Sequence, residues 1–261
     1  MSYLGLNGLA VVTGAGQGIG QAIARMLLAE GCAVLAIGRT EQKLTALTDE
    51  GDADAHRLLC RALDIRDDTA LAAALDDAEA RFGPIRYLVN AAGVLSPSRL
   101  LETPAQDIRD IIEINLTATL ILTQTVARRM VDARTGAIVT IGSNSGTTAR
   151  TALGAYPASK AGLNHAMKCL GLELAEHGIR CNVVSPGSTD TPMQRGFQSD
   201  ASSLERVLQG DISQWRLGIP LGRMASPDDV ADLTLFLLSQ RARHITMENI
   251  VLDGGATLGA R

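Results

Sequence analysis

Short apolar runs alternate with longer amphipathic stretches along nearly the whole chain. The runs have the length and composition of buried strands, and they span residues 9–13, 32–37, 58–63, 86–90, 136–141, 179–184 and 249–253. The stretches between them have the apolar spacing of helices, most clearly at residues 18–31, 67–82, 104–132, 154–177 and 227–239. This alternation predicts an α/β fold, with a doubly wound parallel sheet of about seven strands and helices on both faces.

The chain shows no internal repeat, low-complexity tract or Pro/Ser-rich linker, so residues 1–261 are predicted to form one domain. One segment breaks the alternation. Residues 188–216 are polar and carry Trp215, the single tryptophan of the chain. A long insertion of this kind is expected to form a lid or a pair of short helices rather than a second domain. We call residues 188–216 the lid segment.

Composition and charge exclude several classes of partner. The net charge is −4 with no basic block, which argues against nucleic-acid binding. No apolar stretch reaches membrane-spanning length, so no membrane partner is expected. The cysteines are scattered without a CxxC pair, which indicates reduced thiols in a cytoplasmic protein; they are Cys32, Cys60, Cys169 and Cys181. The four histidines lack metal-ligand spacing, so no metal site is expected.

A glycine-rich loop lies between the first predicted strand and the first predicted helix. It reads "TGAGQGIG" (residues 13–20), with glycines at 14, 18 and 20. Glycines there allow a tight turn, let the backbone approach a pyrophosphate and let the helix pack close to the strand. Phosphates would then rest on N–H groups at the helix N-terminus. The loop predicts a dinucleotide site.

The end of the second strand bears on the choice of cofactor. Many dinucleotide sites hold an acidic residue there, which bonds the ribose 2′-hydroxyl. This chain has Gly38 followed by Arg39. An arginine can pair with a 2′-phosphate, and no carboxylate repels that phosphate, so the local chemistry favours NADP. NAD stays open, because Arg39 could equally face solvent.

A tyrosine and a lysine stand four residues apart in "YPASK" (residues 156–160). If a helix starts there, Tyr156 and Lys160 lie on one face, and Pro157 is tolerated in the first turn. A lysine ammonium beside a phenol favours the phenolate, so Lys160 is expected to lower the pKa of Tyr156. That would make a proton-transfer group. Taken alone, the spacing fits an exposed pair at a helix start equally well.

These motifs in this order resemble the short-chain dehydrogenase/reductase family over the whole chain. The glycine loop, "NAAG" (90–93), Ser143, "YPASK" and "SPG" (185–187) all have matching positions, and so do Asn115 and Asp64. The resemblance implies a single Rossmann-type domain that acts as an NAD(P)-dependent oxidoreductase and assembles as a homotetramer. It also suggests that His165 and Cys169 pack at a subunit contact.

The resemblance assigns the catalytic roles. Tyr156 would be the general base of an oxidation, or the general acid of a reduction, with Lys160 beside it to bind the nicotinamide ribose. Ser143 would hold the reacting oxygen, and Asn115 would hold a water that connects Lys160 to solvent. The cofactor-binding residues it implies are Gly14, Gln17, Gly18, Ile19, Gly20, Arg39, Asp64, Ile65, Asn90, Ala91, Gly93, Tyr156, Lys160, Pro186, Gly187 and Thr189.

A narrower resemblance lies in the last third of the chain, in residues 180–195, 217–223, 244–246 and 253–260. These stretches are similar to family members that oxidise a cyclic dihydrodiol acid to a catechol acid for siderophores. Those members resemble NAD-dependent enzymes with an acid after the second strand. The resemblance therefore implies NAD, while Arg39 favours NADP.

The dihydrodiol hypothesis requires a cation for the carboxylate of a small-molecule substrate. Arg150, in the loop before Tyr156, or Arg195, in the lid segment, could clamp it, with Ser143 and Tyr156 at the reacting oxygen and Met193 over the ring. Two other substrates remain open, a 3-oxoacyl thioester and a dihydro-hydroxyanthranilate. A non-catalytic NADP-binding regulator is the alternative from another class, but such proteins often lose the tyrosine or lysine that this chain keeps.

Overall fold

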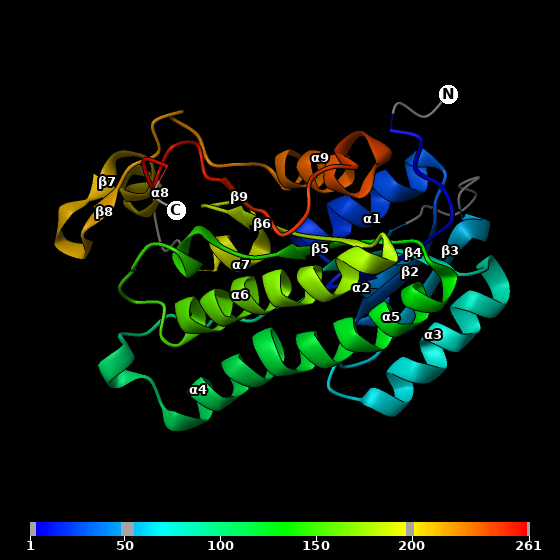
Figure 1. Ribbon diagram of the computed structural model, residues 1–261. Helices are drawn as coiled ribbons and strands as arrows, with labels where there is room; N and C mark the ends of the chain where they lie inside the picture. Colours follow the sequence, from blue (N-terminus) through cyan, green and yellow to red (C-terminus); the bar gives the residue numbers. More distant parts are fainter. Residues whose placement is uncertain (1–3, 48–54, 197–200, 260–261) are drawn as a thin grey trace.

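A parallel seven-stranded sheet forms the centre of the protein (Figure 1). The computed structural model describes residues 4–47, 55–196 and 201–259. The strands are β1 (Leu9–Thr13), β2 (Ala33–Gly38), β3 (Leu58–Ala62), β4 (Ile85–Asn90), β5 (Ala137–Ile141), β6 (Arg180–Pro186) and β9 (Asn249–Leu252). Their order is β3-β2-β1-β4-β5-β6-β9. The predicted sheet is confirmed, and each predicted strand lies within two residues of an observed one.

Helices cover both faces of the sheet, as Figure 1 shows. One face carries α1 (Gly18–Glu30) and α9 (Pro227–Leu238), which also pack against each other. The other face carries α3 (Asp68–Phe82), α5 (Thr119–Ala133) and α6 (Tyr156–Leu174). The remaining helices are α2 (Glu41–Thr45), α4 (Ala105–Ile112), α7 (Pro192–Arg195) and α8 (Ala201–Gln209).

Strand β1 is buried on both sides, which explains why its sequence is a continuous apolar run rather than an alternating one. Leu9 and Val11 point into the layer with α3, α5 and α6. Ala10 and Val12 point into the layer with α1 and α9. The sheet therefore separates two hydrophobic cores, and residues 9–12 of β1 all face one core or the other.

The strand order reverses between β1 and β4, because β2 and β3 lie to one side of β1 while β4 and the later strands lie to the other. In open α/β sheets, ligands bind outside the carboxyl ends of the strands at such a switch point. The loops after β1 and β4 meet there: Thr13 Oγ1 accepts hydrogen bonds from the backbone N–H groups of Ala91 (3.1 Å) and Ala92 (3.2 Å).

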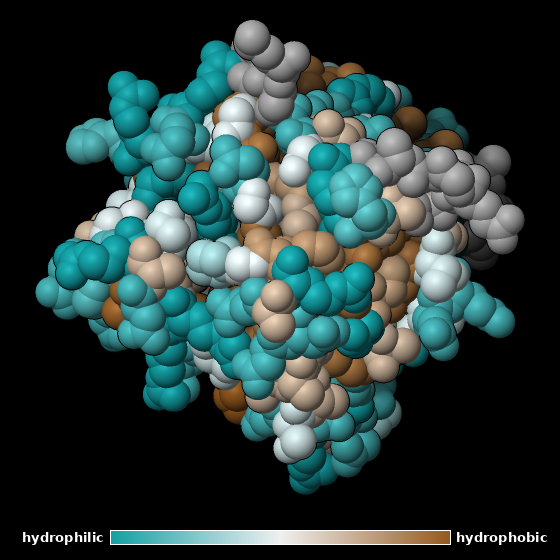
Figure 2. All heavy atoms as spheres, turned by 90° about the vertical axis from the view of Figure 1, so that its right-hand side faces the viewer, coloured by the Kyte–Doolittle hydropathy of each residue, from teal (hydrophilic) through white to brown (hydrophobic). Residues whose placement is uncertain are grey.

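Strand β3 forms one edge of the sheet. Edge strands expose unpaired backbone groups, and charged side chains on them discourage pairing with another chain. Arg61 of β3 forms an ion pair with Asp77 of α3. Figure 2 views the molecule from this side, where hydrophilic residues surround the apolar ones that reach the surface.

The stretch predicted as one helix over residues 104–132 is interrupted. Between α4 and α5 the chain makes a π-helical turn, η3 (Glu113–Ala118), which contains Asn115. Thr119 Oγ1 donates to the Ile114 carbonyl (3.1 Å) in this region. A π turn adds a residue to the helix and changes the direction of the side chains beyond it, a feature that apolar periodicity does not reveal.

The lid segment contains α7, α8 and nearly all of a small antiparallel hairpin. The hairpin is formed by β7 (Gly210–Asp211) and β8 (Arg216–Leu217). In Figure 1 this hairpin lies at the end of the molecule away from α3. The lid segment thus includes a pair of short helices, and the hairpin was not expected from the sequence.

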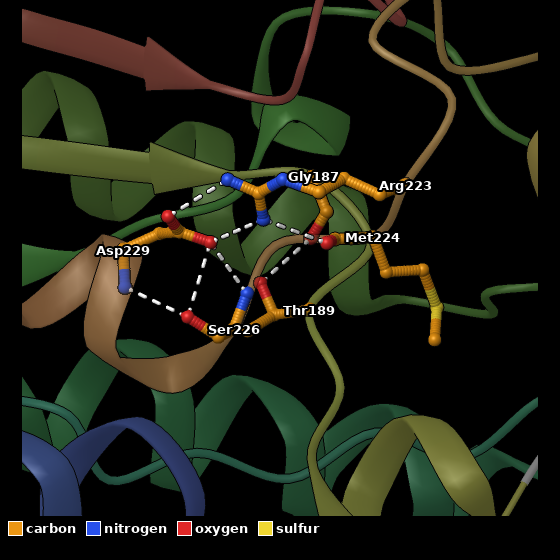
Figure 3. A network of polar contacts seen from close by, with 6 residues as sticks. All are labelled: Gly187, Thr189, Arg223, Met224, Ser226 and Asp229. Carbon is orange, nitrogen blue, oxygen red and sulfur yellow. Dashed lines mark hydrogen bonds and ion pairs between the residues drawn. The ribbon is translucent and has the colours of Figure 1, made fainter.

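The chain that leaves β6 is tied to the start of α9. Asp190 N–H donates to the Ala225 carbonyl (2.8 Å), and Ala225 N–H donates to the Ser188 carbonyl (3.0 Å). Figure 3 shows the neighbouring polar network, in which Arg223 and Asp229 form a two-pronged ion pair at 2.6 and 2.9 Å. The base of the lid segment is therefore fixed to the fold.

Helix α9 begins with a reciprocal cap. Ser226 Oγ accepts from the Asp229 N–H (3.1 Å), and the Asp229 carboxylate accepts from the Ser226 N–H (2.7 Å). Hydrogen bonds from Arg223 and Ser226 hold the pKa of Asp229 well below its usual range. The carboxylate thus stays charged, which stabilises the positive N-terminal end of the helix.

Two features that would indicate a membrane or a metal partner are absent from the described residues. In those ranges, no helix combines the length and apolar character needed to cross a bilayer. Within the same residues, no group of three or more His, Cys, Asp or Glu side chains is placed to hold a metal ion. The four cysteines are free thiols; Cys32 and Cys181 are buried, and Cys169 is exposed on α6.

Candidate active site

Two adjoining cavities lie at the carboxyl ends of the strands. The larger, of about 450 Å³, is lined by Ser143, Tyr156 and Lys160. The smaller, of about 240 Å³, is lined by the glycine loop and the end of β2. Both are lined by Ile19, Ala91, Gly93, Ile141, Thr191 and Met193. A long ligand with two ends can therefore occupy both.

The glycine loop forms the junction between β1 and α1. Gly14 has a left-handed backbone (φ 67°), and a Cβ there would lie 2.8 Å from the Ala91 backbone. A Cβ on Gly20 would lie 2.3 Å from the Gly14 carbonyl oxygen. Side chains are therefore excluded at both positions. Helix α1 starts without a side-chain cap or an acidic residue in its first turn, so its positive end is available to a phosphate.

The smaller cavity is also lined by the residues expected to bind the adenosine. Arg39 is exposed at its rim, and Asp64 lies half-buried. Arg66 donates two hydrogen bonds to the Asp64 carboxylate, at 3.0 and 2.7 Å, and these lower the pKa of that carboxyl. Arg39 lies near enough to lower it further. Asp64 is therefore ionised, and the cations around it offset its charge.

Lys43 also lines this cavity and was not among the residues predicted from the sequence. Its ammonium donates to Gln17 Oε1 (2.6 Å), which connects α2 to the glycine loop. A cation in the first turn after β2 can face the same ligand group as Arg39. The signal was its distance from Arg39, four residues, but a short helix such as α2 has no clear apolar pattern.

Tyr156 and Lys160 lie on one face at the start of α6, with Pro157 in the first turn, as predicted. The Lys160 ammonium stands 5.6 Å from the centroid of the Tyr156 ring. It donates to the Ile141 carbonyl at the end of β5 (2.8 Å) and is 4% exposed. The pair is therefore held inside the cavity wall and does not form an exposed couple at a helix start.

Burial determines the protonation of this pair in the protein alone. It raises the pKa of the Tyr156 phenol to about 12, and it lowers the pKa of Lys160 to about 8. The expected lowering of the Tyr156 pKa by Lys160 is not found. The opposing contribution comes from a hydrogen bond with Ser143. Desolvation of the enclosed phenol outweighs that hydrogen bond.

Ser143 stands at the end of β5 and is 9% exposed. Its Oγ lies 2.9 Å from Ser145 Oγ and accepts from the Ser145 N–H (3.2 Å). With its hydrogen bond to Tyr156, these contacts fix the hydroxyl beside the phenol. A substrate oxygen that meets both groups is held in line for proton transfer.

Asn115 is fully buried behind the cavity. Its Oδ1 accepts from the Val94 N–H (2.8 Å), and its Nδ2 donates to the Val94 carbonyl (2.9 Å) and to Ser159 Oγ (3.1 Å). Both amide hydrogens are thus used within the protein. The side chain joins the loop after β4 to α6. The role of Asn115 in holding a water between Lys160 and solvent stays a prediction.

Asn90 also lies away from the cavities. It is buried, and its Nδ2 donates to Thr123 Oγ1 (2.8 Å) and Thr140 Oγ1 (3.0 Å). The other residues predicted to bind the cofactor line one cavity or both; they are Gly14, Gln17, Gly18, Ile19, Gly20, Arg39, Asp64, Ile65, Ala91, Gly93, Tyr156, Lys160, Pro186, Gly187 and Thr189.

The predicted substrate residues separate into two groups. Arg150 and Met193 line the larger cavity together with Ser143 and Tyr156. Arg195 does not lie in its lining. Its guanidinium forms a two-pronged ion pair with Asp190, at 2.7 and 2.9 Å, on the surface. The structure therefore brings Arg150 to the proton-transfer groups and leaves Arg195 outside.

Comparison with known proteins agrees with this arrangement. Residues 14–257 match the family model described as enoyl-(acyl carrier protein) reductase. A short-chain type dehydrogenase/reductase of known structure from Mycobacterium marinum is 30% identical, with a TM-score of 0.85 over 96% of this chain and 95% of that one.

The chain belongs to the short-chain dehydrogenase/reductase family.

Three relatives in the family bear the names of two different activities. The 2,3-dihydro-2,3-dihydroxybenzoate dehydrogenase of Bacillus subtilis is 42% identical over 99% of this chain and 100% of its own length. The vibriobactin-specific enzyme of the same kind from Vibrio cholerae is 37% identical over 97% of both chains. The 3-oxoacyl-acyl-carrier-protein reductase of Escherichia coli is 35% identical over 95% of this chain and 96% of its own.

The family uses a nicotinamide cofactor, and the described residues fit one. Because Gly14 and Gly20 have no side chains, only backbone would face a bound pyrophosphate. The positive N-terminal end of α1 points to the same place. Such a cofactor supplies an acceptor for hydride. The residues of this chain would hold it and move the accompanying proton: Lys160 at the nicotinamide ribose, Tyr156 at the substrate oxygen.

Two further cationic side chains line the larger cavity and were not expected from the sequence. They are Arg206 of α8 and Arg216 of β8. Arg216 Nη2 donates to Ser188 Oγ (2.6 Å). The sequence contains several arginines in and after the lid segment, and nothing in their spacing distinguishes one that faces the cavity from one that faces solvent.

Replacing Tyr156 with Phe should lower kcat/KM by about 10²- to 10⁴-fold, the usual contribution of a general base. The phenol must lose its proton before it accepts one from the substrate. Wild-type kcat/KM for oxidation should therefore rise with pH, and the variant should lose that rise. Steady-state assays across pH check both effects. Cofactor binding should stay near normal, and near wild-type turnover in the variant would contradict the assignment.

Proposed function

We propose that the protein oxidises 2,3-dihydro-2,3-dihydroxybenzoate to 2,3-dihydroxybenzoate with NAD or NADP, as a step in siderophore biosynthesis. One observation carries the proposal: Arg150, a partner for a substrate carboxylate, lines the same cavity as Ser143 and Tyr156. Two full-length relatives that are 42% and 37% identical bear the name of this activity.

The proposed chemistry follows from the positions of these groups. A bound nicotinamide would supply the acceptor for the C3 hydrogen as hydride, and the Tyr156 phenolate would take the proton of the C3 hydroxyl. Ser143 donates a hydrogen bond to the same oxygen and orients it. The C3 ketone that results then loses the C2 proton, its oxygen takes up a proton, and the ring becomes aromatic. Aromatisation draws the reaction toward oxidation.

The raised pKa of Tyr156 in the protein alone requires a further contribution before the phenol can act as a base. The positive charge of an oxidised nicotinamide next to the phenol favours its ionised form. Lys160, whose pKa is lowered to about 8, adds a positive charge below that pH. The phenolate is thus expected to form in the complex with oxidised cofactor.

A reduction of 3-oxoacyl thioesters is the second candidate, and the 35% identical relative from Escherichia coli favours it. A dihydro-hydroxyanthranilate is a further possible substrate of the same chemistry. The cavity discriminates between the first two. A half-buried arginine beside the tyrosine suits a small acid, whereas an acyl chain needs an apolar channel.

The assembly and location are also proposals. A homotetramer is supported by apolar side chains on the outer surfaces of α5 and α6, where Ile121 is 40% and Leu172 69% exposed. The exposed Cys169 of α6 belongs to the same surface. Four free thiols support a reducing, cytoplasmic compartment.

The direct test is absorbance at 340 nm with trans-2,3-dihydro-2,3-dihydroxybenzoate and each oxidised cofactor in turn. We expect reduced cofactor and catechol acid in equal amounts. A 3-oxoacyl thioester with reduced cofactor is the comparison in the opposite direction. Turnover of the thioester but not of the diol would overturn the proposal in favour of the second candidate.

We propose that Arg39 and Lys43 favour NADP through contact with its 2′-phosphate. Replacing Arg39 with Ala should then raise the KM for NADP roughly 10- to 100-fold, as expected for the loss of about 1.5–3 kcal/mol in charged hydrogen bonds. The KM for NAD should change little. Steady-state kinetics with both cofactors measure this, and equal effects on both, or a strong wild-type preference for NAD, would refute it.

Replacing Arg150 with Met should lower kcat/KM for the carboxylated diol by roughly 10- to 100-fold, because one charged hydrogen-bond donor is lost. A matched cyclic alcohol without the carboxylate should be spared, since only the acid has a charge for the arginine to meet. Kinetics with the two substrates measure the difference.

Two further variants complete this test. Lysine at position 150 should restore part of the activity, because it returns the charge but not the planar fork. Replacing Arg195 with Met is the matched control and should leave both substrates unaffected, since Arg195 pairs with Asp190 outside the cavity. Equal slowing of both substrates by the Arg150 change would make that arginine structural.

A further inference from the structure

A second arginine approaches the catalytic cavity from the hairpin. Arg216, the first residue of β8, lines the same cavity as Arg150, Ser143 and Tyr156. Both arginines are half-buried. They reach this cavity from different parts of the chain, Arg150 from the loop before α6 and Arg216 from the hairpin after α8.

The guanidinium of Arg216 is held in place by a neutral group. Its Nη2 donates to Ser188 Oγ (2.6 Å), directly after the Pro186–Gly187 turn. Along the chain that the structure describes, no carboxylate forms an ion pair with Arg216 or with Arg150. The guanidinium of Arg206 and the carboxylate of Asp211 line this cavity as well, and Asp211 accepts hydrogen bonds from Ser213 rather than forming an ion pair with Arg150 or Arg216.

Asp253 is the carboxylate that acts electrostatically on Arg150, and it is already engaged. One of its oxygens accepts from Asn144 Nδ2 (3.2 Å) and Thr257 Oγ1 (2.8 Å), and the other accepts from the Gly255 N–H (3.0 Å). These bonds fix Asp253 to the loop after β5 and to the C-terminal segment. Asp253 therefore leaves the hydrogen-bonding face of Arg150 to a ligand.

The two arginines are close enough to influence each other. Burial lowers the pKa of Arg216, and the positive charge of Arg150 lowers it further, against a smaller opposing effect of Asp211. Burial likewise lowers the pKa of Arg150. Placing two like charges in a partly buried cavity has a free-energy cost that a bound anion removes.

We infer that Arg216 and Arg150 form a two-armed clamp for the carboxylate of a small cyclic acid, and that Arg216 is a specificity-determining residue. The inference deepens the proposed function and rests on its acidic substrate. A carboxylate between the two forks receives hydrogen bonds from both sides, which no single arginine in this cavity provides. The ring then extends toward Ser143 and Tyr156.

The clamp has a consequence for the hairpin. Its tip already touches the Arg150 loop, since Thr151 Oγ1 lies 3.5 Å from the Gln214 carbonyl. Trp215 lies between Gln214 and Arg216 in the chain. Its side chain is 82% exposed, and its backbone is left-handed (φ 54°). Without a ligand the two arginines repel each other. A bound carboxylate attracts both, and because Arg216 belongs to the hairpin, the hairpin moves toward the cavity. The only tryptophan of the chain then reports on binding.

The test is a titration of the protein, saturated with oxidised cofactor, with cyclohexanecarboxylate, followed by tryptophan fluorescence. We expect a saturable change with wild-type protein and none with cyclohexanemethanol, the neutral analogue. Replacing Arg216 with Met should raise the Kd about 10- to 100-fold, as for the loss of one charged donor. The Arg216→Lys variant should recover part of the affinity. That recovery would show that weak binding by the Arg216→Met variant does not come from misfolding.

Matched controls separate the clamp from general electrostatics. Replacing Arg195 with Met should leave the Kd unchanged, because its partner is Asp190. Replacing Ser188 with Ala should weaken binding severalfold, because Arg216 loses its hydrogen bond. The KM for either cofactor should be unaffected by the Arg216 change. Wild-type affinity in that variant, or inorganic phosphate binding as tightly as the carboxylate, would overturn the inference.

This test is independent of turnover. If the dihydrodiol is not oxidised but cyclohexanecarboxylate binds through Arg216, the proposed function fails and the clamp stands. If the dihydrodiol is oxidised and the Arg216→Met variant binds the acid like the wild type, the function stands and the clamp fails.

Discussion

The site depends on one buried cation, the Lys160 ammonium against the end of β5. A charged amine inside a protein loses its hydration, at a cost of several kcal/mol unless it is paired or hydrogen-bonded. Here the Ile141 carbonyl accepts from it, and the Tyr156 ring lies 5.6 Å away. A Cβ on Gly93 would stand only 3.7 Å from the ammonium. The loop after β4 therefore passes the lysine at van der Waals distance.

The surrounding elements are arranged to keep that lysine in position. Asn115, in the π-helical turn before α5, ties the backbone at Val94 to Ser159 of α6, the residue next to Lys160. Ser159 Oγ in turn donates to the Tyr156 carbonyl (2.7 Å). The π-helical turn thus joins the loop after β4 to α6, next to Tyr156 and Lys160. Such turns often occur at functional sites.

Charge is distributed unevenly in this acidic protein. The chain carries a net charge of −4, yet cations gather at both ends of the continuous cavity, Arg39 and Lys43 at one and Arg150 and Arg216 at the other. Asp64 and Asp211 also line these cavities, but in each lining the cations outnumber the carboxylates, and such an excess attracts ligands of the opposite sign. The acidic remainder of the surface then favours entry of anions at the cavity rather than elsewhere.

The sequence by itself determined the fold and the relative placement of Tyr156 and Lys160. Seven apolar runs identified the seven strands, because parallel strands that are buried on both faces are mostly apolar along their length. The spacing of Tyr156 and Lys160 placed them on one helix face, since that relation is local. The glycine loop was equally readable, because its steric requirement acts within a few residues of chain.

Only the tertiary structure decided the protonation of the pair and the residues around the substrate. The pKa of Tyr156 rises because the fold encloses it, and burial of this kind is not encoded near residue 156. Arg195 pairs with Asp190, whereas Arg216 reaches the cavity, although both are arginines at polar positions. Which of them faces a ligand depends on the path of a loop and a hairpin, and those paths are set by contacts between residues distant in sequence, such as Arg216 with Ser188.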